Sequence, residues 1–166
     1  MIALHDFNHL PHEKALALIH PCVALPEWAD ALALGRPYAS LDELFSTANA
    51  LTQAWGEAAL AQALSAHPRI GEKPAGSQAE AALSRQEQGA VNDRDAALAQ
   101  ALREGNARYE ARFGRVFLIR AKGRSGEEIL QALHARLENS DAQEVRAALE
   151  QLREITLLRL EGVISE

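Results

Sequence analysis

Two short segments of the chain combine residue types that could transfer a proton. The first contains His67 followed by Pro68, and the second contains Ser84, Glu87 and Gln88. An imidazole titrates near neutral pH, so His67 can donate or accept a proton in the working range. Pro68 biases the residue before it away from helical geometry, which favours a rigid, extended presentation of the imidazole. These residues are therefore candidates for an acid–base site.

The second segment is predicted to lie on a helix, where residues three and four apart share a face. The hydroxyl of Ser84, the carboxylate of Glu87 and the amide of Gln88 would then project together. Two plainer interpretations remain open. His67 can cap the helix that ends before it and interact favourably with its dipole. The second segment can also be a solvated polar helix face.

Arg159 is the third candidate, because it falls on the apolar stripe of the last predicted helix. The stripe comprises Val145, Ala148, Leu149, Leu152, Ile155 and Thr156, and its helical period continues to position 159. A cation on an inward face should be paired or should face a ligand, because burying it alone is costly. Three interpretations remain: a pocket cation, a buried ion pair (with Glu87, for example) and snorkelling at the helix end.

The segment Ile119-Arg120-Ala121-Lys122-Gly123 is the last candidate. It leads from an apolar run into a glycine-ended loop before a predicted helix start. Backbone N–H groups outside helices and sheets could bind carbonyl or carboxylate groups there. Lys122 and Arg124 can add positive charge, although exposure to solvent is the more common fate of such residues.

Helices must position these candidates, and four helix starts share the capping-box pattern. Each has a serine followed three residues later by Glu or Gln, and the boxes begin at Ser40, Ser77, Ser125 and Ser140. Apolar residues at helical spacing follow each box. Residues 57–66 and 93–112 are also helix-like.

Several interruptions separate the predicted helices. Pro21 ends the first helix, and Pro26 begins the next at a first-turn position. Arg36 lies in a break, where it is expected to be a solvated loop charge rather than an anchor. Only Val116–Ile119 resembles a strand. Since one short strand cannot build a sheet, this run is predicted to be a buried extended segment or a helix start.

Length and composition indicate the fold class. The 166 residues are 48% hydrophobic but only 5% aromatic. Ala and Leu dominate this apolar content, and both lose little on entering a helix. The sequence therefore predicts an all-α protein, a single domain over residues 1–166 with about seven or eight helices.

Charge and cysteine content exclude several classes of protein. The net charge of −6 argues against a nucleic-acid binder and against docking on an anionic membrane. Cys22 is the only cysteine, so neither an internal disulfide nor a cysteine-rich zinc site is possible. No membrane span, secretory signal or peroxisomal C-terminus is recognisable, so a cytoplasmic protein is expected. His5, His9 and His12 could share a face as metal ligands, but Pro11 favours a fraying N-terminal turn.

Taken together, these residues resemble the family of 2-oxo-4-hydroxy-4-carboxy-5-ureidoimidazoline (OHCU) decarboxylases. The matching pieces are His67-Pro68-Arg69-Ile70-Gly71, Ser84-x-x-Glu87-Gln88, Phe117-Leu118-Ile119 with Gly123, Glu154-Ile155 through Arg159-Leu160, Phe7-Asn8-x-Leu10, Trp28, Arg36-Pro37-Tyr38 and Ala54-Trp55. The resemblance therefore covers nearly the whole chain. Departures are Pro21, where relatives often have a second cysteine, and Glu72, where they often have Asp.

The resemblance implies the last step of urate breakdown, which yields (S)-allantoin. It implies an all-helical homodimer that acts on a small molecule without a metal or organic cofactor. His67 would be the catalytic acid, Glu87 its partner, and Arg159 a ligand for the anionic or carbonyl groups of the substrate. The residues implied to contact the substrate are Pro68, Ser84, Arg85, Gln86, Glu87, Gln88, Ile119, Arg120, Ala121, Lys122 and Gly123.

Two other hypotheses come from different functional classes. In the first, the chain is a helical binding or regulatory module in which His67 and Glu87 form a structural pair. It predicts no turnover of a urate-derived substrate. In the second, the chain is a metal-dependent hydrolase that uses the N-terminal histidines, and a chelator would then abolish its activity.

Overall fold

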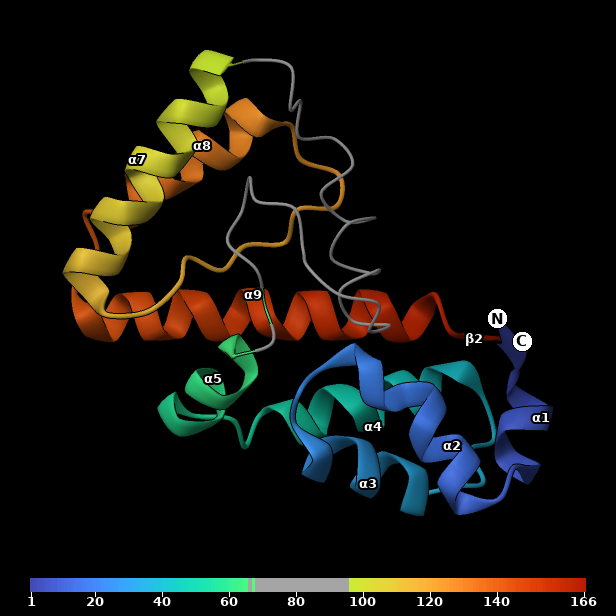
Figure 1. Ribbon diagram of the computed structural model, residues 1–166. Helices are drawn as coiled ribbons and strands as arrows, with labels where there is room; N and C mark the ends of the chain where they lie inside the picture. The colour runs from blue at the N-terminus through green and yellow to red at the C-terminus, as the bar shows by residue number, and fades with distance from the viewer. Residues whose placement is uncertain (66, 68–95) are drawn as a thin grey trace. The chain divides into compact units, whose positions relative to one another are not determined.

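The computed structural model describes residues 1–65, 67 and 96–166 (Figure 1). Within these residues, eight α-helices and one short 3-10 helix account for most of the chain, and the predicted all-α class is confirmed. The elements are β1 (Ile2–Ala3), α1 (Leu4–His9), α2 (His12–Ile19), η1 (His20–Cys22), α3 (Pro26–Leu34), α4 (Leu41–Thr52), α5 (Glu57–Leu64), α7 (Ala96–Phe113), α8 (Gly126–Arg136), α9 (Asp141–Glu161) and β2 (Ile164–Ser165). No helix among the described residues is both long enough and apolar enough to span a bilayer.

The chain divides into two compact units. Unit 1 comprises Met1–Ala63 and Arg153–Glu166, and unit 2 comprises Leu64–Leu152. Helix α9 contributes its first part to unit 2 and its second part to unit 1.

Two of the predicted capping boxes are complete. At the start of α8, the Glu128 N–H donates to Ser125 Oγ (3.2 Å) and the Ser125 N–H donates to Glu128 Oε1 (3.1 Å). At the start of α9, the same reciprocal bonds join Ser140 and Gln143 at 2.9 and 3.2 Å. Hydrogen bonds from the backbone and side chain of Ser125 lower the pKa of the exposed Glu128 carboxyl. Each serine therefore starts its helix as the pattern predicts.

The box at the start of α4 differs in one bond. Ser40 Oγ accepts from the Glu43 N–H (3.1 Å), as predicted. The Glu43 carboxylate, however, accepts from the Ala39 N–H (2.7 Å) instead of returning to Ser40. The box predicted at Ser77 lies outside the described residues.

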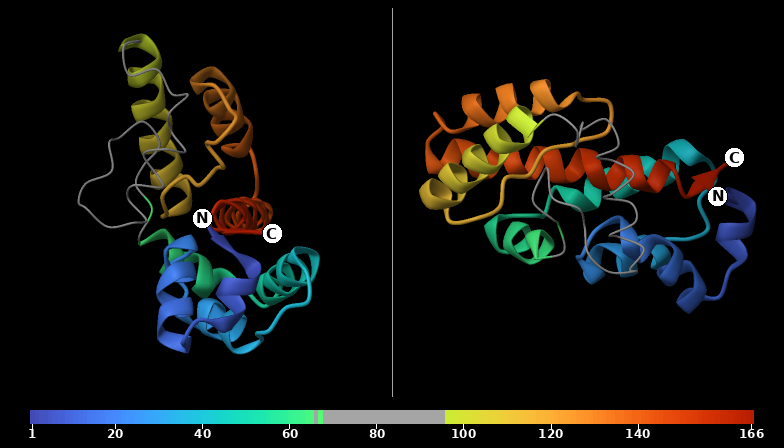
Figure 2. Two further views of the ribbon diagram at one scale, coloured as in Figure 1. Left: turned by 90° about the vertical axis from the view of Figure 1, so that its right-hand side faces the viewer. Right: turned by 45° about the horizontal axis from the view of Figure 1, so that its top comes forward.

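Residues Leu4–His9 of unit 1 form helix α1, so the turn predicted there is wrong. Phe7 on α1 is fully buried, with 0% of its surface exposed, which anchors the helix. β1 pairs in parallel with β2, so both ends of this unit lie side by side (Figure 2). The sequence did not predict this pairing, because two residues are too few to show an alternating pattern.

Arg36 is an anchor and not a solvated charge, which corrects the interpretation favoured from the sequence. Its Nη1 donates to the carbonyls of Phe7 (2.9 Å) and Leu10 (2.7 Å), and its Nε donates to the carbonyl of Ala33 (2.8 Å). The guanidinium also lies 5.5 Å from the centroid of the Phe7 ring. Arg36 thus adds charged donors to carbonyls at the C-terminal ends of α1 and α3, where the last carbonyls of a helix have few partners.

Replacing Arg36 with Ala is expected to lower the free energy of unfolding by about 2–3 kcal/mol, because charged hydrogen bonds to three carbonyls are lost. Arg36→Lys keeps the charge but not the forked donors, so it should recover only part of this loss. Urea denaturation followed by circular dichroism measures both effects. Arg146→Ala, at an exposed position on α9, is the control. If Arg36→Ala is as mild as this control, Arg36 does not anchor α1.

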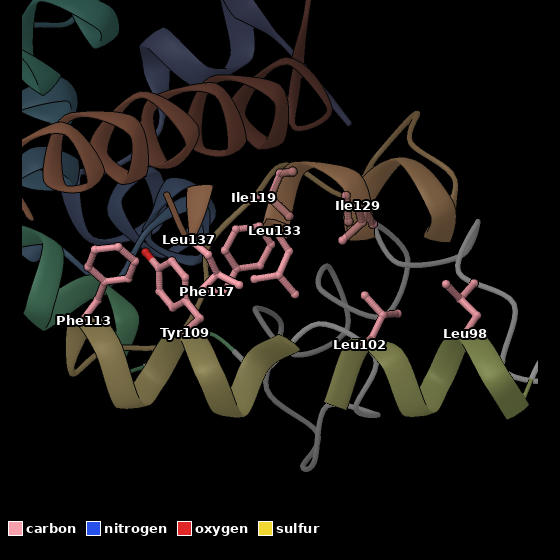
Figure 3. Close-up of a cluster of buried hydrophobic side chains, with 10 residues drawn as sticks. Leu98, Leu102, Tyr109, Phe113, Phe117, Ile119, Ile129, Leu133 and Leu137 are labelled. Carbon is pink, nitrogen blue, oxygen red and sulfur yellow. The ribbon is translucent and has the colours of Figure 1, made fainter. Parts of the chain in front are cut away.

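Unit 2 is built around the packing of α7 against α8. Their facing side chains, with those of the 117–121 segment, form one buried apolar cluster (Figure 3). Its members are Leu98, Leu102, Tyr109, Phe113, Phe117, Ile119, Ala121, Ile129, Leu133 and Leu137. A Cβ added at Gly105 on α7 would overlap Leu133 Cδ2 on α8. The absence of a side chain at Gly105 therefore lets the two helices approach closely.

Gly105→Ala is expected to destabilise unit 2 by roughly 1–2 kcal/mol, since overpacking outweighs the better helix propensity of alanine. Leu133 is fully buried, so moving its methyl group aside displaces other side chains of a close-packed core. In a Leu133→Ala background the same change should be neutral or stabilising, because the obstructing methyl group is gone. Thermal denaturation of the four proteins in this double-mutant cycle measures the coupling. Additive effects would show that Gly105 and Leu133 do not compete for space.

The strand-like run is a buried segment outside helix and strand. Phe117, Leu118 and Ile119 expose only 1%, 4% and 4% of their surface. Helix α8 does not begin until Gly126, so the helix-start alternative is wrong and the buried-segment alternative is correct. Phe117 and Ile119 belong to the buried apolar cluster, although their segment pairs with no strand among the described residues.

Candidate functional site

His67 follows the end of α5, as the sequence predicted. Its backbone N–H donates to the Leu64 carbonyl (3.1 Å), which closes the turn after the helix. The residue is half-buried, and its Nε2 is shielded from solvent. Helix α5 itself ends at Leu64, slightly before the predicted limit at 66. The imidazole is therefore held at a helix C-terminus and is partly withdrawn from water.

Six predicted site residues lie outside the described part of the chain. They are Pro68, Ser84, Arg85, Gln86, Glu87 and Gln88. The proximity of Glu87 to His67 accordingly remains a prediction.

Arg159 is buried in unit 1, with 3% of its surface exposed. Its Nη1 lies 3.4 Å from the Cys22 carbonyl, to which it donates. An inward-facing arginine is what the stripe predicted, and burial this deep rules out snorkelling. The pocket-cation and ion-pair interpretations both stay open. The convergence of Arg159 with His67, which belongs to unit 2, stays a prediction.

The segment from Ile119 to Gly123 lies in unit 2 and ends in a turn. The Arg124 N–H donates to the Ala121 carbonyl (3.1 Å), and Gly123 has a φ of +83°. This left-handed conformation favours glycine, which explains why a glycine ends the loop. Arg124 Nε also donates to the Arg120 carbonyl (2.9 Å), so its charge is used within the loop.

Several backbone N–H groups of this segment have no acceptor among the described residues. Within the described residues, the N–H groups of Ile119, Ala121, Lys122 and Gly123 donate no hydrogen bond to the protein. Ala121 is buried, whereas Lys122 and Gly123 are exposed, so the segment passes from the core to the surface. Unused donors at such a boundary suit a carbonyl or carboxylate group of a small molecule.

A buried carboxylate in unit 2 was missed by the sequence analysis. Glu144 on α9 is fully buried, and its Oε1 accepts from Tyr109 Oη (2.5 Å) and Arg136 Nε (2.8 Å) as well as from Arg136 Nη2. Its Oε2 accepts from Asn139 Nδ2 (3.0 Å). Burial and the hydrogen bond to Glu144 raise the pKa of the Tyr109 hydroxyl, so this group stays a donor. The carboxylate is therefore both paired and hydrogen-bonded, as a buried charge must be.

The signal for Glu144 was present in the sequence. Glu144 precedes Ala148 by four residues and Leu152 by eight, so it shares their helix face. The same reasoning that singled out Arg159 on this stripe would have found it.

The buried carboxylate is linked to the candidate binding segment. Arg136 Nη1 donates to the Leu118 carbonyl (2.5 Å), and its guanidinium lies 4.5 Å from the centroid of the Phe117 ring. One residue beyond Ile119, the Arg120 N–H donates to Gln151 Oε1 (2.9 Å) on α9. Side chains from α8 and α9 therefore hold the backbone of the segment in place.

The N-terminal histidines make other contacts. His9 Nδ1 donates to the His5 carbonyl (2.7 Å), and the two rings lie 4.4 Å apart. His12 Nε2 and Asp30 Oδ1 are 3.0 Å apart. Across residues 1–65, 67 and 96–166, no three or more His, Cys, Asp or Glu side chains are grouped closely enough to hold a metal ion.

Unit 1 also contains an open cleft of about 670 Å³ between α3, α4 and α5. It is lined by Leu25, Pro26, Glu27, Trp28, Ala31, Leu51, Ala54, Trp55, Ala58, Ala59 and Gln62. Trp28 is tied to the fold, because its Nε1 donates to the Ala48 carbonyl (3.1 Å). Among the described residues, the lining contains no predicted site residue, no imidazole and no cation; its one charged side chain is that of Glu27.

Comparison with known proteins gives consistent matches over nearly the whole chain. The family model described as OHCU decarboxylase matches residues 8–161. A 2-oxo-4-hydroxy-4-carboxy-5-ureidoimidazoline decarboxylase of Amia calva is 33% identical over 146 residues, which are 87% of this chain and 81% of that protein. The uric acid degradation bifunctional protein TTL of Arabidopsis thaliana is 32% identical over 150 residues, but these cover only 46% of its length.

A solved structure matches at the level of the fold and of the sequence. It is described as OHCU decarboxylase in the presence of (S)-allantoin, with a TM-score of 0.72 and 28% identity. The match covers 92% of this chain and 97% of that one.

Proposed function

Because this chain belongs to the OHCU decarboxylase family, we propose that it converts OHCU to (S)-allantoin in urate degradation. It is accordingly a lyase of the carboxy-lyase class. The match of the family model over residues 8–161 is the observation that carries this proposal.

The chemistry makes modest demands on a protein. The bond between the ring carbon and the carboxylate breaks, carbon dioxide leaves, and the electron pair stays on a carbon next to a C=N bond. The ring itself can delocalise this pair. The protein must orient the substrate, stabilise the developing charge and deliver one proton to one face of the neighbouring C=N carbon, which bears the ureido group and becomes the stereocentre of allantoin, while the hydroxyl of the decarboxylated carbon gives up its proton and becomes the carbonyl. Delivery to a single face makes the product a single enantiomer.

Each proposed catalytic residue has one of these tasks. His67 donates the proton, which suits its half-buried position at the end of α5. Glu87 orients the substrate and tunes the charge of His67. Arg159 binds anionic or carbonyl groups, and its burial supports this role, because a charge withdrawn from water interacts more strongly.

The remaining substrate contacts are proposed for two segments. The first comprises Pro68 and Ser84 to Gln88. The second is Ile119 to Gly123, where the unused N–H groups among the described residues support binding of a carbonyl or carboxylate. We propose that this single-domain chain acts as a homodimer in the cytoplasm, on a small molecule and without a metal or organic cofactor. A family match that spans residues of both compact units supports the single domain.

A coupled assay tests the proposed activity. Urate oxidase and hydroxyisourate hydrolase generate OHCU from urate, and circular dichroism at the allantoin bands follows product formation. We expect the circular dichroism signal of (S)-allantoin to grow much faster with the protein than with a heat-denatured sample. EDTA should leave the rate unchanged. A racemic product formed at the uncatalysed rate would favour the non-catalytic helical module instead.

A further inference from the structure

We propose that Gln151 is a positioning residue for this reaction, because it holds the backbone that presents N–H groups to the substrate. The inference rests on the proposed function. It adds a residue on α9 that lies outside the predicted catalytic and substrate-contacting sets.

Two side chains form hydrogen bonds to the peptide groups on either side of Ile119. Before it, the Leu118 carbonyl accepts from Arg136 Nη1 (2.5 Å). After it, the Arg120 N–H donates to Gln151 Oε1 (2.9 Å). Since these groups flank one residue, the two bonds together restrict both backbone dihedral angles of Ile119.

This restriction matters because the segment has no regular backbone hydrogen bonds of its own. It belongs to neither a helix nor a strand. Among the described residues, its first backbone–backbone hydrogen bond is the one that the Arg124 N–H donates to the Ala121 carbonyl at the turn. The orientation of its N–H groups therefore depends on side chains from α8 and α9. Loss of either hydrogen bond would let the N–H groups of the segment change direction. A small misplacement of groups that position a substrate lowers the rate of catalysis considerably.

Gln151 is a cleaner probe of this positioning than Arg136. Arg136 also forms a hydrogen-bonded ion pair with the buried Glu144, so replacing Arg136 would disturb the core of unit 2. Among the described residues, the Gln151 side chain makes one hydrogen bond, which it accepts from the Arg120 N–H, and the residue is only half-buried. Its replacement is therefore expected to change the segment more than the stability of the fold.

The test compares variants that differ in the acceptor at position 151. Gln151→Met keeps the length of the side chain but removes the acceptor, and kcat/KM for OHCU should fall about tenfold, with a lower enantiomeric excess of (S)-allantoin. Gln151→Glu restores an acceptor oxygen and should return the enantiomeric excess to that of the original protein. Glu150→Ala, at the adjacent exposed position, is the control and should behave like the original protein.

A second readout separates positioning from a general loss of stability. In Gln151→Met the Arg120 amide should exchange its hydrogen faster, while the melting temperature stays within a few degrees of that of the control. If Gln151→Met does not melt cooperatively, Gln151→Asn replaces it under the same criteria, because it withdraws the oxygen from the Arg120 amide.

Two results would overturn the inference, and they are distinguishable. If the original protein forms no excess of (S)-allantoin above the uncatalysed reaction, the proposed function fails and the positioning role fails with it. If the original protein is active but the folded Gln151→Met variant matches it in kcat/KM and enantiomeric excess, only the positioning role is wrong.

Discussion

His67→Asn is expected to lower kcat for OHCU decarboxylation by roughly a hundredfold or more, because general acid catalysis contributes about 10²–10⁴ in rate. Asparagine has a similar shape and can still form a hydrogen bond, but its amide cannot release a proton near neutral pH. Protonation of the ring carbon would then fall to water, which can approach either face. The residual product should therefore be close to racemic, which circular dichroism of the coupled reaction detects directly.

The control for this variant is another histidine of the same chain. His134 lies at an exposed position on α8, so His134→Asn should leave both rate and enantiomeric excess unchanged. Melting curves of both variants establish that the fold is retained. If the His67→Asn protein still forms (S)-allantoin at close to the original rate, His67 is not the acid. A different residue must then deliver the proton.

Glu144→Gln is expected to lower the free energy of unfolding by about 3–5 kcal/mol, because it leaves the guanidinium of Arg136 with no charged partner in the core. The Arg136 side chain is only 11% exposed and the Glu144 side chain is 0% exposed. A loss of this size is a large part of the total stability of an ordinary domain. Guanidinium chloride denaturation, followed by circular dichroism, measures it.

A double variant shows whether the cost comes from the unpaired charge. Glu144→Leu with Arg136→Met removes both charges and fills the space with apolar groups, which is often neutral or stabilising for buried ion pairs. It should therefore be more stable than Glu144→Gln alone. Glu150→Gln, exposed on the same helix, is the matched control and should change stability by no more than about 0.5 kcal/mol. A Glu144→Gln variant as stable as this control would contradict a central role for the buried network.

The elements that the sequence predicted correctly depend on near neighbours. The boxes at Ser125 and Ser140 pair each serine with a residue only three positions away. The helical stripe of α9 likewise follows from spacing alone, and it predicted correctly that Arg159 faces inward. Such features need no knowledge of which helices pack together.

The features that were wrong or missed depend on distant partners. Arg36 binds the carbonyl of Phe7, 29 residues away, so its role as an anchor is invisible in the local pattern. The strands β1 and β2 exist only because the two ends of the chain meet. Glu144 shares a helix face with the predicted stripe but was not included in it, and its partner Tyr109 lies 35 residues earlier, where no local rule connects the two.

The sequence by itself determined where helices begin, which faces are apolar and which residue types are available for proton transfer, because these properties follow from side-chain chemistry and helical period. Only the tertiary structure decided which buried charges are paired and what holds the irregular segment at Ile119. The physical reason is that a buried charge or a free peptide group is stabilised by whatever lies nearest in space, and that neighbour is set by packing rather than by distance along the chain.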